Sequence, residues 1–210
     1  KHWPVLKKLG KVVIDMTPSR VGMMCVPAIN LEHCLEEFNV NMVTCGGQAS
    51  TPLAYLIGKT HPDVSYIEVV SSIASKSAGP ATRLNIDEYV ETTANAASFF
   101  SGCTNTKAIL ILNPAIPCVN MQTTVFATVG QNNMKELKVL VDEIVAKIQV
   151  YVPKYQLIVP PTMEDNRIIM TVQVQGLGDY MPSYAGNLDI INCAAIVTAE
   201  EYAKKNLKSA

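Results

Sequence analysis

The order of the apolar segments constrains the fold of this chain most strongly. Short runs rich in β-branched residues, typical of strands, alternate with segments whose apolar residues recur at helical spacing. In the first part each run is followed by a helical segment, and later runs follow one another more directly. This order predicts a mixed α/β fold with an open sheet. The expected strands are residues 11–15, 40–45, 64–75, 107–114, 123–129, 155–159 and 167–175, and the expected helices are residues 49–59, 85–100, 134–149 and 187–206.

Composition argues against several classes of function. The 17 Lys+Arg nearly balance the 18 Asp+Glu without a basic stripe, so we expect neither nucleic acid nor an anionic membrane as a partner. The longest apolar runs, such as residues 108–112, are far shorter than a membrane span. The 6 cysteines are scattered without a C-x-x-C pair, which is typical of reduced thiols in the cytoplasm. With only 3 histidines, no metal site is expected.

Cys45 lies in the segment NMVTCGGQAS, where an expected strand, two glycines and an expected helix meet. At such a strand end a side chain can reach a crevice, and Gly46 and Gly47 would shape the turn and let the backbone approach a ligand. Amides at the helix start would lower the pKa of the thiol and could hold an oxyanion. The alternative is a small buried apolar residue, because cysteine is often found inside proteins. The spacing alone favours neither interpretation.

Two other segments have features of ligand-binding loops. Residues 75–85, SKSAGPATRLN, combine hydroxyl groups, a glycine and a cation, and Asn85 is expected to cap the next helix. Residues 181–189, MPSYAGNLD, precede the last expected helix. An ordinary Gly-Pro turn followed by a helix cap explains the first segment more simply. No expected strand is followed by G-x-G-x-x-G, so the sequence contains no dinucleotide-binding fingerprint.

The chain closely resembles a known family in five segments that occur in the family's order. These are NVNMVTCGGQA, SKSAGPATRLNIDEYVETT, KAILILNPA, YVPKY and YAGNLDI, and IDMTPSRVGMMCVPAINLE fits as well. The family is the acylating acetaldehyde dehydrogenases, the CoA-dependent enzymes that partner a 4-hydroxy-2-oxovalerate aldolase. The likeness extends over nearly the whole chain. It implies NAD and coenzyme A as small molecules, a homodimer, the aldolase as a partner, and a role in the breakdown of aromatic compounds.

The resemblance also implies a mechanism and a set of site residues. The thiolate of Cys45 would attack acetaldehyde to give a thiohemiacetal, hydride would pass to NAD, and the acetyl group would move from Cys45 to coenzyme A. The cofactor contacts that the resemblance implies are Ser77, Ala78, Gly79, Pro80, Ala81, Thr82, Arg83, Leu84, Asn85 and Asn187.

Three departures from the family pattern accompany this likeness. The chain begins after the part that carries the family's glycine-rich loop, it is shorter between residues 159 and 168, and Thr123 stands where the family commonly has an Asp that assists acid/base chemistry. We therefore expect impaired activity. The expected parts are the end of a Rossmann-type nucleotide-binding domain (1–44), an α+β catalytic and dimerisation domain with a mostly antiparallel sheet (45–184), and a helix that returns to the first part (185–210).

Two alternatives to the acylating enzyme remain open at this stage. A truncated relative without catalytic activity would serve as a dimerisation or aldolase-binding module. Another semialdehyde dehydrogenase with a thioester intermediate would need the same cysteine, but it fits the flanking segments less well.

Overall fold

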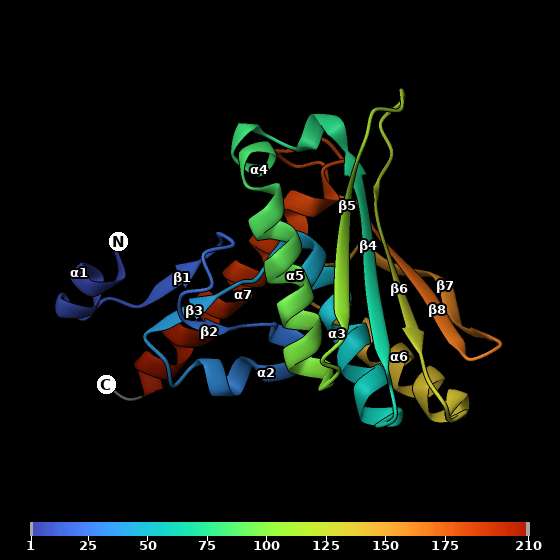
Figure 1. Cartoon of the computed structure of the whole chain (residues 1–210). Helices are drawn as coiled ribbons and strands as arrows, with labels where there is room; N and C mark the ends of the chain where they lie inside the picture. Colours follow the sequence, from blue (N-terminus) through green and yellow to red (C-terminus); the bar gives the residue numbers. More distant parts are fainter. Residues whose placement is uncertain (1, 209–210) are drawn as a thin grey trace.

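The computed structural model describes residues 2–208, which form two sheets and the helices around them (Figure 1). The smaller sheet is parallel, with its three strands in the order β1-β3-β2. The expected strand at 40–45 is too long, because the ladder ends at Asn41. Sequence patterns did not predict α1, β2 or α2, each of at most eight residues. The elements of this part are α1 (Trp3–Lys8), β1 (Val13–Asp15), β2 (Met23–Met24), α2 (Pro27–Cys34) and β3 (Asn39–Asn41).

The larger sheet has five strands in the order β5-β4-β6-β8-β7. Only β4 and β5 run parallel, and the other three neighbouring pairs are antiparallel. Together the two sheets confirm the expected α/β class with a mostly antiparallel main sheet. The strand β7 continues through Pro160 and Pro161, beyond the expected end at 159, with register shifts against β8. The strands are β4 (Tyr66–Ala74), β5 (Thr106–Asn113), β6 (Met121–Thr128), β7 (Tyr155–Glu164) and β8 (Arg167–Val174).

Helices α3, α5 and α6 pack on one face of the large sheet and enclose the main core (Figure 1). In α6 the apolar residues recur every three or four positions, so that Leu137, Val141 and Ile148 are all buried. The long α7 returns to the small sheet and packs against α2 and β1. No helix within residues 2–208 is long and apolar enough to cross a lipid bilayer. These helices are α3 (Cys45–Thr60), α5 (Ile86–Ser101), α6 (Met134–Gln149) and α7 (Gly186–Lys208).

The opposite face of the large sheet carries no helix among the described residues (Figure 1). Side chains alternate along each strand, and most of those on this face of β4, β6 and β8 are half-buried. At its centre Val70 of β4 lies between Ile109 of β5 and Thr124 of β6, and Phe126 lies opposite Ile169. An apolar strip thus crosses the uncovered face of the sheet.

The segment between β4 and α5 differs from the expected loop. It contains a short 3₁₀ helix (Ser75–Ser77) and the five-residue helix α4 (Pro80–Leu84). Pro80 is the first residue of α4, where its missing N–H costs no hydrogen bond. Asn85 is the N-cap residue of α5, as expected, but its side chain makes no capping bond and its amide donates back to the Ala81 carbonyl at 2.8 Å.

Gly58 marks the closest approach of α3 to α5. A Cβ atom at this position would lie 2.7 Å from the Cα and the carbonyl carbon of Ser101, which are backbone atoms that cannot turn aside. We therefore expect Gly58→Ala to destabilise the protein by about 1–3 kcal/mol, the usual cost of overpacking. Thermal unfolding would measure this as a fall in Tm of about 2–4 °C per kcal/mol.

Gly79→Ala is the matched control for this substitution. A Cβ at Gly79 would meet nothing within 4 Å, and its φ of -73° suits alanine. This variant should unfold at the temperature of the native chain or slightly above it. Equal Tm values for both variants and the native chain would contradict the close packing of α3 on α5.

Candidate active site

The connection from β3 to α3 determines where Cys45 lies. Val43 has a φ of 60°, a left-handed conformation that is costly for a β-branched residue, and its amide donates to the Asn41 side chain at 2.9 Å. Thr44 is extended, and its hydroxyl accepts the Gly47 amide at 2.8 Å as the N-cap. Cys45 is therefore the first residue of α3.

Gly46 and Gly47 lie inside the first turn of α3 and do not form the turn that we expected. Glycine is needed at both positions because neighbouring side chains approach the backbone closely, and neither glycine has a positive φ. A Cβ at Gly47 would lie 2.5 Å from Cγ1 of Val43. A Cβ at Gly46 would overlap the Tyr89 hydroxyl and lie 2.8 Å from Oγ of Ser71. Both glycines thus allow α3 to start against its neighbours.

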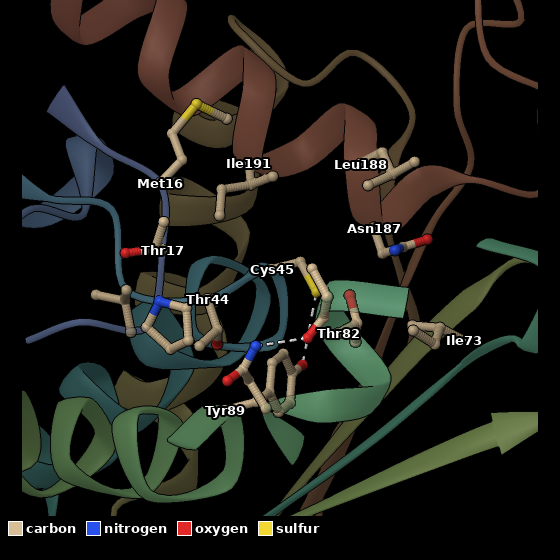
Figure 2. Close-up of a pocket in the computed structure, with 14 residues that line it drawn as sticks. Met16, Thr17, Thr44, Cys45, Ile73, Thr82, Tyr89, Asn187, Leu188 and Ile191 are labelled. Carbon is tan, nitrogen blue, oxygen red and sulfur yellow. Dashed lines mark hydrogen bonds between the residues drawn. The ribbon is translucent and has the colours of Figure 1, made fainter. Parts of the chain in front are cut away.

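Cys45 lines a cavity of about 270 Å³ (Figure 2). This volume is slightly below the usual range for ligand pockets, about 300–1,000 Å³. The wall combines residues 16–18 after β1, residues 43–45, parts of α4 and α5, and the start of α7. Of the described residues that line it, Cys45 alone is a cysteine, and none is Asp, Glu, His, Lys or Arg. The cavity therefore presents one thiol within an uncharged wall.

The hydroxyl of Tyr89 is hydrogen-bonded to the sulfur (Figure 2). The Cys45 thiol donates to Tyr89 Oη at 3.6 Å, and the Gly46 amide donates to the same oxygen at 3.0 Å. Burial raises the pKa of the Cys45 thiol, and hydrogen bonds from Tyr89 and from the amides of Gly46 and Cys45 oppose it only in part. The expected lowering of the thiol pKa is wrong for this reason: the uncharged wall outweighs the helix start.

The residues that the resemblance nominated for cofactor contacts divide into three groups. Ala81, Thr82, Asn85 and Asn187 line the same cavity as Cys45. Ser77 and Gly79 line a neighbouring hollow that shares Thr82 with the first. The remaining four nominated residues line neither of these two hollows. Among them, the Arg83 guanidinium donates hydrogen bonds to the Ser75 and Ala78 carbonyls. This last group is Ala78, Pro80, Arg83 and Leu84.

Asn187 at the start of α7 is the nominated residue with an unused polar atom. Its side chain is buried and lines the cavity. Its amide nitrogen is 3.5 Å from the Ser77 carbonyl, whereas its oxygen Oδ1 has no hydrogen-bond partner within the described residues. A buried amide oxygen without a partner is costly, so it favours a ligand that donates a hydrogen bond here.

Sequence reasoning missed Tyr89, Ser71 and the arrangement around Thr123. Tyr89 follows Asn85 by four positions, so the two side chains share a face of α5 and both line the cavity. That spacing could have indicated Tyr89. Thr123 is buried in β6, its hydroxyl is 3.0 Å from that of Ser71, and it is not among the residues lining the cavity. The Thr123 hydroxyl is therefore linked to Cys45 through the hydroxyls of Ser71 and Tyr89.

Metal ligands do not gather at this site or elsewhere in the described part of the chain. Within residues 2–208 no three His, Cys, Asp or Glu side chains come together in a way that could hold an ion.

Both solved structures and curated sequences are similar to this chain. The structure of aspartate semialdehyde dehydrogenase II from Vibrio cholerae, complexed with ASA, superposes with a TM-score of 0.65 over 97% of this chain and 73% of its own. The identity is 13%, so this likeness concerns the fold alone. Sequences described as acetaldehyde dehydrogenase are much more similar. That of Spirochaeta aurantia is 59% identical over 97% of this chain and 68% of its own length.

Two further observations identify the family. The acetaldehyde dehydrogenase of Pectobacterium atrosepticum is 56% identical over 95% of this chain and 68% of its own length. Residues 45–182 match the family model described as prokaryotic acetaldehyde dehydrogenase, dimerisation. The chain therefore belongs to the prokaryotic acetaldehyde dehydrogenases, a family of oxidoreductases.

Proposed function

We propose that this chain carries out the NAD- and CoA-dependent oxidation of acetaldehyde to acetyl-CoA, with Cys45 as the nucleophile. The observation that supports this most directly is a single thiol that lines a small cavity at a helix start. The Cys45 thiolate would form a C–S bond to the carbonyl carbon, giving a tetrahedral adduct. NAD, when bound, would accept the hydride that leaves this carbon, so that an acetyl thioester of Cys45 remains. The thiol of CoA would then attack the acetyl carbon and release Cys45.

Asn187 fits the cofactor in this proposal. Its buried Oδ1 lacks a donor among the described residues, and a carboxamide N–H such as that of nicotinamide would supply one. Ala81, Thr82 and Asn85 lie on the same cavity wall and are the other proposed contacts from the nominated segment. The cavity admits an acetyl group and one ring, so most of the dinucleotide and of coenzyme A would extend beyond it.

A homodimer is the proposed assembly. The matched family model is described as a dimerisation domain, which supports it. We place the interface on the uncovered face of the large sheet, because the apolar strip around Val70 is otherwise left to solvent.

The aldolase partner and the cytoplasmic location also remain proposals, and the six free cysteines are in keeping with a reducing compartment. The division of the chain at residues 44 and 184 likewise stays an interpretation.

A non-catalytic dimerisation or aldolase-binding module is the second candidate. The uncharged wall favours it, because no carboxylate or imidazole lines the cavity within the described residues to act as a base. The two candidates differ in one measurable property. A catalytic chain must form an acyl thioester on Cys45, whereas a docking module need not.

Acetylation by acetyl-CoA tests the proposed function without NAD. Thioester exchange transfers the acetyl group from the CoA sulfur to the Cys45 sulfur and leaves free CoA, so atoms and charge balance. We expect peptide mass mapping to find the acetyl group on Cys45, and Cys45→Ser to lose the thioester. The matched control is Cys118→Ser, which removes another half-buried thiol outside the cavity and should leave the acetylation of Cys45 unchanged.

Failure of this exchange would favour the docking module. The result that contradicts the enzyme is acetylation spread over several cysteines, or absent from Cys45, in native chain that melts cooperatively.

Val70→Lys tests the proposed dimer interface. Val70 lies in a central strand and is half-buried in the single chain, so a lysine there can extend into solvent when the chain is alone. In a dimer it would bury a charge against the partner, which costs several kcal/mol. Light scattering should give about twice the chain mass of 22.8 kDa for the native protein and 22.8 kDa for this variant at micromolar concentration.

Phe99→Lys is the control for the dimer test. Phe99 is an exposed residue of α5, on the helical side of the sheet, so a charge there should leave the dimer intact. A Val70→Lys protein that keeps the dimer mass would exclude this face as the interface.

A further inference from the structure

The Tyr89 hydroxyl is held at a defined position beside the nucleophile. The ring is buried, and its oxygen accepts the Gly46 amide at 3.0 Å and the Cys45 thiol at 3.6 Å. The hydroxyl can reach this place only because residue 46 is glycine, since a Cβ there would occupy the same space. Two hydrogen bonds and the space left by Gly46 thus place one phenol oxygen beside the sulfur.

On its other side the Tyr89 phenol meets the neutral hydroxyl of Ser71. Ser71 of β4 is within hydrogen-bonding reach of the phenol, and the Ser71 hydroxyl lies 3.0 Å from that of Thr123 in β6. The polar groups that line the cavity from the remaining elements are also uncharged: Thr82 of α4, Asn187 of α7 and Thr17 after β1. Among the described residues lining the cavity, Cys45 and Tyr89 are therefore the only pair with ionisable side chains.

We propose that Tyr89 is a positioning residue for Cys45, whose hydroxyl donates a hydrogen bond to the sulfur once the thiol has ionised. In the thiol form the S–H donates to Oη. On ionisation the S–H bond breaks and its proton leaves to solvent, while the O–H bond of Tyr89 stays intact and turns towards the sulfur. Ser71 can then donate to Oη in its place. The inference rests on the proposed function, because only a nucleophile needs its thiolate stabilised.

Burial supports this assignment of donor and acceptor. It raises the pKa of the Tyr89 phenol well above its usual value, so that the phenol keeps its proton while the thiol ionises. A hydrogen bond to an ionised acceptor is roughly twice as strong as one between neutral groups. No cation lines the cavity within the described residues. The hydrogen bond from Tyr89 and those from the adjoining amides are therefore the interactions that stabilise the thiolate.

Tyr89→Phe tests the proposal by the pH profile of alkylation at Cys45. Iodoacetamide reacts with the thiolate, and mass mapping gives the rate at Cys45 alone. Removing the hydroxyl should shift this profile upwards by about one pH unit, which is about a tenfold smaller thiolate fraction at each pH below the midpoint. The matched control is Tyr202→Phe, which removes a buried hydroxyl bonded to the Glu37 carbonyl far from the cavity and should leave the profile unchanged.

Gly46→Ala provides a second, independent variant. Its methyl group would displace the phenol from the sulfur without removing the hydroxyl, so the profile should again shift upwards. In the Tyr89→Phe background the methyl group meets one atom fewer, and its cost in Tm should be smaller.

The outcomes distinguish this inference from the proposed function. If Cys45 of the native chain reacts no faster than the other cysteines and takes no acetyl group, the proposed function is wrong. If Cys45 is acetylated but Tyr89→Phe and Gly46→Ala keep the native pH profile, the proposed function stands and the role of Tyr89 is overturned. Should Tyr89→Phe fail to melt cooperatively, the Gly46→Ala profile decides.

Discussion

The connection between β3 and α3 is the constraint on which the site depends. Val43 takes a left-handed conformation that its branched side chain disfavours, and the Asn41 side chain and the Thr44 cap hold the chain there. This abrupt change from strand to helix leaves Cys45 at the first helical position. Backbone strain of this kind persists only where the surrounding structure holds the conformation. Here the packing of α3 against α5 and β4 holds it.

The site is assembled from parts that are distant in the sequence. The segment after β1 supplies residues 16–18, α5 supplies Tyr89, and α7 returns to supply Asn187 and its neighbours (Figure 2). The thiol and the phenol that meet here are 44 residues apart. Packing of α3 on α5 therefore does two things at once: it closes the core and it sets the distance between the sulfur and its hydrogen-bonding partner.

Periodicity predicted much of the large sheet and its helices, because strands such as β4 and helices such as α6 each bury one regular face. The short elements β2 and α4 were missed, since Gly-Pro and similar local signals are shared by turns and helix starts. Cys45 could be nominated from its neighbours in sequence. The spacing from Asn85 could place Tyr89 in the cavity wall, but not beside the sulfur, because that contact arises between two helices and needs the space left by Gly46. The direction of the thiol pKa also depends on a wall that no local pattern describes.

The uncharged wall has opposite effects on the two halves of the proposed reaction. A thiolate of higher pKa is a stronger nucleophile, although less of it is present at neutral pH. When coenzyme A attacks the acetyl thioester, Cys45 becomes the leaving group, and a thiol of high pKa leaves more slowly. A hydrogen bond from Tyr89 to the departing sulfur would lower that barrier, and it would also increase the thiolate fraction before the first step. With no carboxylate lining the cavity within the described residues, one neutral hydroxyl placed by Gly46 can assist both the formation and the release of the thioester.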